Sequence, residues 1–312
     1  MRNDKMKNSY RENFLVSEMN SRTRRLTILA FAVGSFAIGT AEFVAMGLQP
    51  EMARSSYVDI PTAGQYISAY ALGVVIGAPL LALATAKLPR KAVLIGLMFF
   101  YALANIASAF FSDFGILVVL RFISGLPHGI YFGLATMVAA SMVKMNERSK
   151  AVGYVMLGLT IATVLGAPGA TWIGQLVSWQ TAFILVGIIA LLCCLLIWKF
   201  LPFVSNTPIT SPLDELGVLR KKQVWLLLVM VSVGASGLFS VFTYIKSTLM
   251  HISCVSLDFV PFIMPLVGLG MVVGNIGGPK LAAKLGISPL IFFAMLWSVF
   301  VFFLFSFYPI LQ

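Results

Sequence analysis

Hydrophobic residues along this chain form long runs that are separated by short polar breaks. A run of about 20 apolar residues is the length that an α-helix needs to cross about 30 Å of hydrocarbon. Backbone amides find no partners in lipid, so such runs must be helices rather than open strands. The pattern predicts nine membrane-spanning helices, at 26–48, 65–86, 92–110, 115–141, 151–173, 180–201, 224–250, 258–282 and 287–308. The predicted fold class is therefore an all-α, polytopic membrane helical bundle.

Composition and charge agree with a membrane protein. Only 11% of the residues are charged and 59% are hydrophobic, whereas an average soluble domain carries about 25% charged residues. The net charge of +11 would suggest a nucleic-acid partner in a soluble protein. If the N-terminus is cytoplasmic, however, most Lys and Arg residues lie in cytoplasmic segments, and the outer loops carry only Arg54. The charge thus predicts a multi-pass protein of the inner or plasma membrane that contacts an anionic leaflet and binds no nucleic acid.

The polar breaks also predict how the chain is divided. The expected segments are a cytoplasmic tail at 1–25, a six-helix transmembrane half at 26–201, a cytoplasmic linker at 202–223 and a partial second half with three helices at 224–312. A short repeat supports two related halves. Gly77 lies ten residues before Lys87, and Gly274 lies ten residues before Lys284, at the cytoplasmic ends of helices that are six apart.

Five motifs point to a known family. They are Gly39-Thr40-Ala41-Glu42-Phe43, the segment from Ser68 to Pro79 that includes Tyr70, the loop Leu88-Pro89-Arg90-Lys91, the set Arg121, Gly125, His128 and Gly129, and the set Gly158, Gly166, Pro168 and Gly169. In order and spacing the chain resembles the major facilitator superfamily. It is most similar to the proton-antiporting efflux branch, which includes sugar-efflux, nucleoside-efflux and chloramphenicol-resistance transporters.

This resemblance implies a function and a size. It implies a proton-coupled antiporter that exports a small solute, such as a drug, sugar or nucleoside, by alternating access, and that works as a monomer without a cofactor. The family has twelve helices and this chain has about nine, so we expect a C-terminal truncation. The alternative is a transport-inactive truncated remnant, or a membrane sensor of the same fold.

The resemblance also assigns residues to gating. It implies a gating loop that includes Gly77, Arg90 and Lys91, and an antiporter-motif helix that carries Gly158, Gly166, Pro168 and Gly169. The sequence departs from the family in two places. Ala86 stands where an acidic residue is usual, and Ala167 separates the Gly-Pro pair, so a different local bend is expected there.

Two charged residues inside the predicted helices are candidates for proton coupling. A charge at the centre of a bilayer costs about 2.5–3.5 kcal/mol, so those retained are functional candidates. Glu42 lies roughly 24 Å from the inner end of its helix, and Arg121 lies roughly 9 Å below the outer end of its own helix. We expect both to face one cavity, where solute and proton compete for Glu42. The alternative is that Glu42 reaches the outer interface or forms a fixed ion pair.

Three further side chains are candidates for the same site. His128 lies seven residues after Arg121 on nearly the same helix face, where it either relays a proton or packs as a hydrogen-bonded histidine. Met46 follows Glu42 by one turn, and Tyr70 lies in the second motif. With two histidines and scattered acids, the sequence favours neither a membrane enzyme nor a metal site.

Glycines that recur on one helix face predict close helix packing. Gly125, Gly129 and Gly133 are spaced every four residues and would form a smooth strip. A second predicted strip consists of Gly268, Gly270, Gly274 and Gly278.

Overall fold

The structure is a computed structural model, and it describes residues 20–202, 217–252, 255–256 and 259–307. Most of the predicted tail and most of the predicted linker lie outside these ranges. The chain forms two compact units, Met1–Leu213 and Asp214–Gln312. Their boundary falls within the segment 202–223, the predicted linker.

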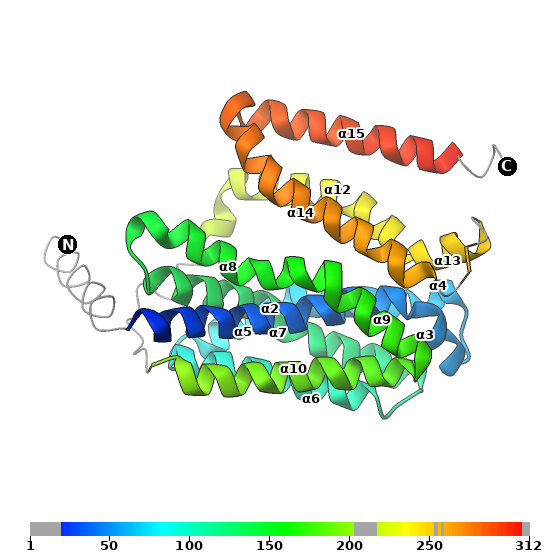
Figure 1. The fold of residues 1–312 in the computed structure, drawn as a ribbon, viewed down its shortest axis with the longest axis horizontal. Helices are drawn as coiled ribbons and strands as arrows, with labels where there is room; N and C mark the ends of the chain where they lie inside the picture. Colours follow the sequence, from blue (N-terminus) through cyan, green and yellow to red (C-terminus); the bar gives the residue numbers. More distant parts are fainter. Residues whose placement is uncertain (1–19, 203–216, 253–254, 257–258, 308–312) are drawn as a thin grey trace, which may run out of the picture. The chain divides into compact units, whose positions relative to one another are not determined.

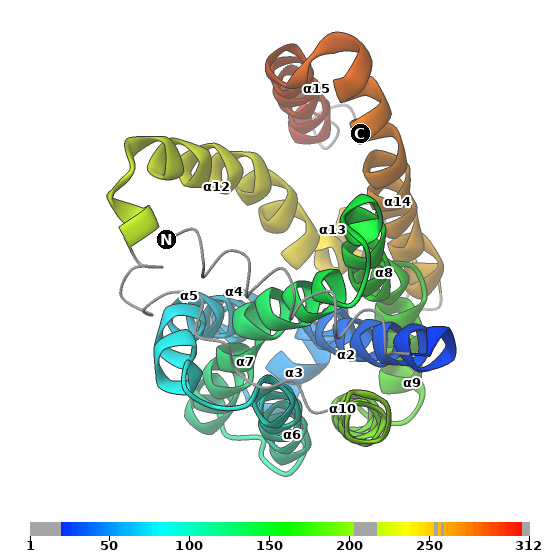
Figure 2. The same cartoon turned by 90° about the vertical axis from the view of Figure 1, so that its left-hand side faces the viewer.

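The first unit is built only from helices in its described part (Figures 1 and 2). In chain order they are α2 (Ser21–Gly47), α3 (Gln49–Ser55), α4 (Ile60–Ala63), α5 (Gln65–Thr85), α6 (Arg90–Ser108), α7 (Phe114–Ser141), the 3₁₀ turn η1 (Met145–Glu147), α8 (Arg148–Ile161), the π-helix η2 (Ala162–Gly166), α9 (Ala167–Leu176) and α10 (Trp179–Phe200).

The second unit is also helical in its described part. Its elements are the 3₁₀ turn η3 (Gly217–Arg220), α12 (Lys222–Thr243), α13 (Ile245–His251), α14 (Val260–Leu285) and α15 (Ile287–Phe307).

The described helices fit a membrane by length and composition. Seven are long and apolar enough to cross it, six in the first unit and α12 in the second. The other two predicted spans correspond to α14 and α15, whose described apolar stretches are Pro265–Gly274 and Ser288–Leu304. The predicted all-α fold class is confirmed.

Short polar residues begin several helices by satisfying free amides. The Asp113 side chain accepts a hydrogen bond from the Ile116 amide (2.9 Å) and so starts α7. Asp59 accepts from the Thr62 amide (2.9 Å) at the start of α4. Hydrogen bonds from the Thr62 side chain and amide hold the pKa of the exposed Asp59 carboxyl below its usual range.

Helices α5 and α7 approach each other closely through glycines. A Cβ atom on Gly73 or Gly77 would collide with the backbone of α7 at Phe122 or Leu126. On the opposite side, a Cβ on Gly125 would collide with the carbonyl oxygen of Tyr70. The two backbones therefore touch without intervening side chains.

The predicted glycine strips are only partly right. Gly125 and Gly129 pack against α5, but a Cβ on Gly133 would meet no described atom within 4 Å. The same is true of Gly270, Gly274 and Gly278 in α14. Glycines that are four residues apart lie on one face of a helix, but this spacing does not determine whether a neighbouring helix packs along the whole face. In the second unit, close packing instead involves Gly237 of α12, which lies against the Phe302 ring of α15.

A π-helical turn changes the register of the helix that continues from α8 into α9. In a regular α-helix, successive residues rotate by about 100°, so Gly158 and Gly166 would drift onto different faces. The wider turn η2, with its i→i+5 hydrogen bonds, takes up more residues per turn and reduces this drift. Both glycines face α2, Gly158 against Ala32 and Gly166 against Thr40. The π-helical turn ends one residue before Ala167, where the sequence departs from the family pattern.

Candidate solute and proton site

A buried arginine lies inside the first unit, two turns after the start of α7. Arg121 of α7 is only 1% exposed. Its guanidinium carbon is 4.4 Å from the ring centroid of Tyr70 on α5 and 5.4 Å from that of Phe183 on α10. The faces of aromatic rings attract cations, and this attraction is stronger away from water. The charge of Arg121 is thus held between rings from two other helices.

The same guanidinium reaches α2 at the level of Glu42. Nη2 of Arg121 donates to the carbonyl oxygen of Ala41 at 3.5 Å. Nε and Nη1 have no hydrogen-bond acceptor among the described residues. Two N–H-bearing atoms of a buried cation therefore remain available to another group.

Glu42 is less enclosed than its neighbour. It is half-buried, and it interacts electrostatically with Arg121. Within the described ranges, no salt bridge of 4.0 Å or less involves Glu42, and the surface pair of Arg54 with Glu51 is the one that occurs. The fixed ion pair that was the alternative interpretation of Glu42 is therefore not present in this conformation.

Tyr70 connects the arginine to three other helices. Its hydroxyl lies 2.9 Å from Nδ1 of His128 on α7 and 3.5 Å from the hydroxyl of Tyr101 on α6. The Tyr101 hydroxyl in turn donates to the carbonyl oxygen of Ile38 on α2 (3.4 Å). The ring of Tyr70 thus supports the cation, while its hydroxyl links α5 to α7 and α6.

Three residues of this cluster were missed by the sequence analysis. They are Tyr101, Asn105 and Phe183. Nδ2 of Asn105 donates to the Tyr101 carbonyl oxygen (2.9 Å), and its buried Oδ1 has no partner among the described residues. A polar residue in an apolar run, one turn after a tyrosine, was a signal that could have identified Asn105. Phe183 carries no such signal.

The remaining candidates differ in their surroundings. His128 is half-buried, and its ring centroid lies 5.2 Å from that of Phe132. Its bond to Tyr70 is compatible with a packing histidine and with a proton relay. Met46, one turn after Glu42, is 1% exposed and so is enclosed by protein in this conformation.

Of the residues assigned to the gating loop, Arg90 and Lys91 lie at the start of α6, whereas Gly77 lies inside α5. Gly77 packs directly on Leu126, and Arg90 is the first residue of α6. Nζ of Lys91 donates to the carbonyl oxygen of Trp198 at 2.7 Å. This places a cation at the C-terminal end of α10, where free carbonyl groups favour positive charge.

The antiporter-motif residues divide into two groups. Gly158 and Gly166 contact α2, and Pro168 is buried in the first turn of α9. A Cβ on Gly169 would meet no described atom within 4 Å, so packing does not explain the glycine at that position.

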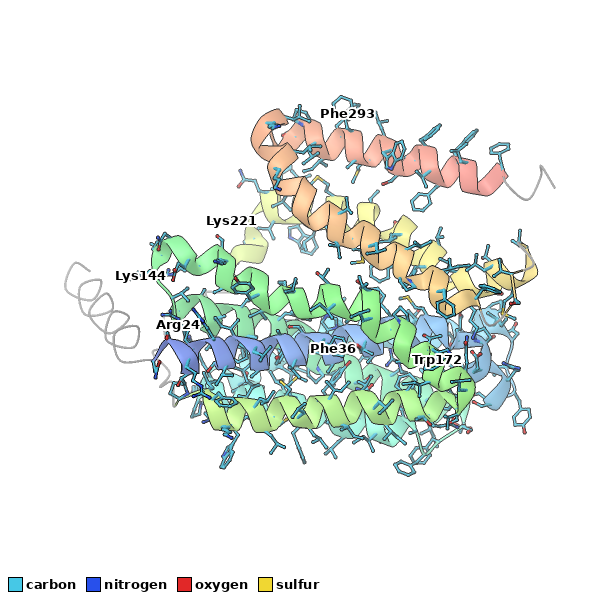
Figure 3. All side chains as sticks on the ribbon, in the orientation of Figure 1. Arg24, Phe36, Lys144, Trp172, Lys221 and Phe293 are labelled. Carbon is cyan, nitrogen blue, oxygen red and sulfur yellow. The ribbon has the colours of Figure 1, made fainter. Side chains whose placement is uncertain are left out.

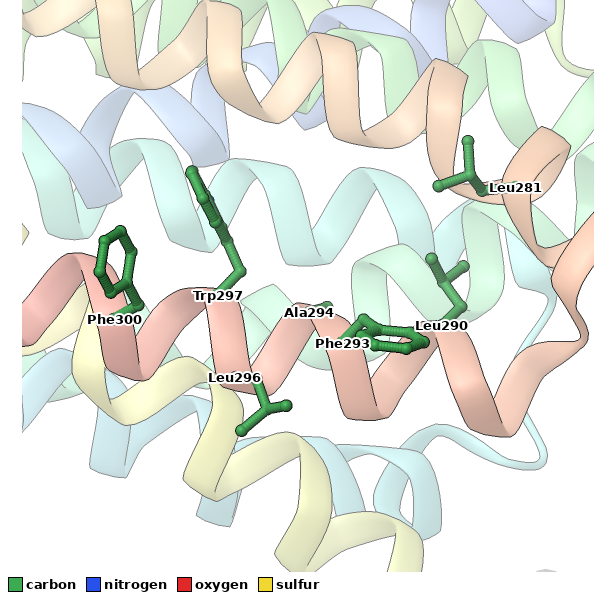
Figure 4. Close-up of a pocket in the computed structure, with 7 residues that line it drawn as sticks. All are labelled: Leu281, Leu290, Phe293, Ala294, Leu296, Trp297 and Phe300. Carbon is green, nitrogen blue, oxygen red and sulfur yellow. The ribbon is translucent and has the colours of Figure 1, made fainter.

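Outside this cluster, the described residues include one more buried charged side chain, Lys246 of α13 in the second unit, which is 1% exposed. A pocket in the second unit lies along α14 and α15 (Figure 4), and its lining is apolar: Leu281, Leu290, Phe293, Ala294, Leu296, Trp297 and Phe300. The described residues also include no group of three or more His, Cys, Asp or Glu side chains that could hold a metal ion.

Comparison with known proteins identifies the class of fold. The sequence profile of the Major Facilitator Superfamily matches residues 31–312. The chain is 38% identical over 257 residues to the inner membrane transport protein YdhP of Escherichia coli K12, covering 82% of this chain and 66% of that protein. It is 31% identical over 263 residues to a probable sugar efflux transporter of Helicobacter pylori, covering 83% and 66% respectively. The chain therefore spans just under two thirds of the length of these relatives.

Solved structures agree with this class. A bacterial homologue of the human lysosomal transporter Spinster, in an inward-facing conformation, superposes with a TM-score of 0.68 at 15% identity, covering 85% of this chain and 64% of that one. Fold and relatives together define a multi-pass membrane protein of a transporter class rather than an enzyme. The chain belongs to the Major Facilitator Superfamily.

Proposed function

We propose that this chain acts in the proton-coupled export of a small solute by alternating access. The observation that supports this most directly is the contrast between Arg121 and Glu42. Arg121 is buried and held by Tyr70, Phe183 and the Ala41 carbonyl group. Glu42 is half-buried beside it and has no salt bridge in the described structure. One charge is therefore fixed and the other can change its partner.

This contrast suggests how antiport would work. A proton and a hydrogen-bond donor of the solute would compete for the Glu42 carboxylate. A hydroxyl or amine group that donates to the carboxylate would displace the proton, and protonation would release the solute. Competition for a single group means that the two move in opposite directions. The positive charge of Arg121 would stabilise the ionised form of Glu42, and Arg121 would stay within the first unit throughout the cycle.

The two compact units would be the two halves that move during transport. Rocking of two halves about a central site is the common form of alternating access in such folds. We further propose that the protein is a monomer in the cell membrane with its N-terminus in the cytoplasm. Gly77, Arg90 and Lys91 would then lie at the cytoplasmic gate, and the helix from Gly158 to Gly169 would guide the movement of α2.

The solute would be a sugar, a nucleoside or a drug of similar size. One similar protein is called a probable sugar efflux transporter, and a site with one carboxylate and free guanidinium N–H groups suits a solute that both donates and accepts hydrogen bonds. A panel that contains pentoses, hexoses, nucleosides and chloramphenicol covers these classes.

Proteoliposomes that contain the full chain and an internal pH dye test this proposal. A solute of the right class, added outside, should enter down its gradient and drive protons out of the lumen, and the Glu42→Gln variant should reduce this proton flux at least tenfold. Glu51→Gln is the matched control, because it removes a partly buried carboxylate of α3 that pairs with Arg54 outside the site, and it should keep the wild-type flux. Unchanged proton-driven flux in Glu42→Gln would contradict the coupling role.

A second candidate function is a sensor, or a remnant without transport activity, of the same fold. The chain spans 66% of the length of these relatives. This second candidate predicts a wild-type protein that is folded and moves no solute of the panel, while Glu42→Gln still changes solute binding.

A further inference from the structure

One end of the first unit carries almost all of its surface cations. Thr27, near the start of α2, donates from its hydroxyl to the Phe200 carbonyl oxygen (2.9 Å), and Lys91, near the start of α6, donates to the Trp198 carbonyl oxygen (2.7 Å). The start of α2, the start of α6 and the C-terminal end of α10 therefore meet. Figure 3 shows Arg24 and Lys144 at this same end and Trp172 at the other.

Basic side chains greatly outnumber acidic side chains at this end. Among the described residues its basic side chains are Arg22, Arg24, Arg25, Lys87, Arg90, Lys91, Lys144, Arg148, Lys150 and Lys199, and its acidic side chain is Glu147. At the opposite end the described charges are Arg54, Glu51, Asp59 and Asp113. Attraction of anions to the basic end follows from this distribution alone, and it does not select a position.

The seam between α6 and α10 marks one particular position at the basic end where an anion could bind. These helices pack side by side in the first unit (Figure 2), and the Cys194 thiol of α10 donates to the Ile95 carbonyl oxygen of α6 (3.5 Å). At the basic end of these two helices lie Lys91, in the first turn of α6, and the exposed Lys199, in the last turn of α10, whose Nζ is 5.5 Å from the ring centroid of Phe200. The Lys91 ammonium has three N–H donors, and the described structure provides one acceptor for them, the Trp198 carbonyl group.

An apolar surface begins directly at these lysines. The Trp198 side chain is 69% exposed, and Leu195 and Leu192 continue the exposed face along α10. Exposed tryptophan is characteristic of the level at which lipid headgroups meet the hydrocarbon. A ligand that matches the seam must therefore carry an anionic group next to a long apolar chain.

We propose that the basic end of the α6–α10 seam binds an anionic phospholipid. Lys91 and Lys199 contact its phosphate, Trp198 lies at the level of its glycerol backbone, and an acyl chain follows Leu195 and Leu192. A free phosphate ion would use the lysines but not the apolar face. The chemistry that the seam offers is thus that of a membrane lipid.

Native mass spectrometry of the purified full chain tests the assignment. The protein is titrated with phosphatidylglycerol and, separately, with phosphatidylcholine of the same acyl chains. Wild-type protein should retain phosphatidylglycerol preferentially. A juxtamembrane lysine contributes about 1 kcal/mol, so the double variant Lys91→Gln, Lys199→Gln should bind phosphatidylglycerol about 25-fold more weakly.

Matched variants separate a site from general attraction. Lys144→Gln with Lys150→Gln removes the same charge from the residue before η1 and from the first turn of α8, away from the seam, and should leave retention within about twofold of wild type. Lys91→Arg with Lys199→Arg keeps the charge and should restore binding, which also controls for misfolding. Equal losses in the two glutamine double variants, equal retention of both lipids, or displacement of the lipid by inorganic phosphate would each overturn the proposal.

Discussion

At the scale of single residues, the stabilisation of Arg121 without a carboxylate partner is the feature with the most consequences. A buried cation needs groups that replace water. Here two aromatic rings and one carbonyl oxygen do so. None of these contacts involves Glu42, so we expect Arg121 to keep them when Glu42 is protonated.

Substitution of Tyr70 should separate its two roles. Tyr70→Phe keeps the ring under Arg121 and removes the hydroxyl that bonds His128, so it should destabilise the protein by about 1 kcal/mol. Tyr70→Leu also removes the ring face and should cost about 2 kcal/mol more. Thermal unfolding in detergent, followed by tryptophan fluorescence, measures both. Equal effects of the two variants would mean that the ring does not stabilise the cation.

Asp59 should make the loop before α5 sensitive to acid. Its folded-state pKa is lowered by hydrogen bonds from Thr62. Asp59 caps the start of α4 through the hydrogen bond from the Thr62 amide. The cap's contribution to stability is therefore complete above the pKa of Asp59 in the unfolded chain, about 3.9, and is lost as the pH falls through the lower pKa of Asp59 in the folded protein. Hydrogen exchange of the Thr62 amide, relative to its intrinsic rate, should lose protection in that range. Asp59→Asn caps without titrating, and its protection should not depend on pH.

The sequence predicted some of the site's residues for a clear physical reason. Charged and polar side chains inside apolar runs are rare and costly, so Glu42, Arg121 and His128 were visible at once. Phe183 could not be found in this way, because an aromatic residue that binds a cation looks like any other lipid-facing or core residue. The lack of an ion pair between Glu42 and Arg121 also depends on side-chain positions that spacing does not determine.

At the scale of helices, direct backbone contact determines where glycine is required. The α5–α7 pair has such contacts at Gly73, Gly77 and Gly125, whereas Gly133 on the same face of α7 has none. The sequence predicted helix positions well, because lipid enforces long apolar runs. It did not predict the π-turn η2, since no residue type is specific for it and packing against α2 favours it.

Two alanine substitutions on one helix test this difference. Gly125→Ala would place a methyl group against the Tyr70 carbonyl oxygen, which cannot move without shifting α5, and should destabilise the protein by about 1–3 kcal/mol. Gly133→Ala meets open space and should change stability by less than about 1 kcal/mol. Unfolding midpoints of the two purified variants provide the comparison. A Gly133→Ala protein as unstable as Gly125→Ala would contradict the packing argument.

At the scale of the whole molecule, the distribution of charge predicts orientation. A cysteine introduced at Arg54, in a background without Cys193, Cys194 and Cys254, should react with a membrane-impermeant maleimide in intact cells. A cysteine at Lys144 should react only after the membrane is permeabilised, because the basic end should face the cytoplasm. Labelling of position 144 in intact cells would reverse the proposed orientation.

The fixed charge of Arg121 also has an electrical consequence. On the proposed mechanism, the site is neutral when Glu42 is ionised and carries one positive charge when Glu42 is protonated. Exchange of a proton for an uncharged solute would then move one elementary charge per cycle, so transport would appear as a current. A membrane potential supplies about 2.3 kcal/mol per charge per 100 mV, which would support roughly a 50-fold solute gradient. The voltage dependence itself follows from the stoichiometry, and an arginine that stays in place would assign it to the step that carries the proton-loaded site, because the solute-loaded site is neutral.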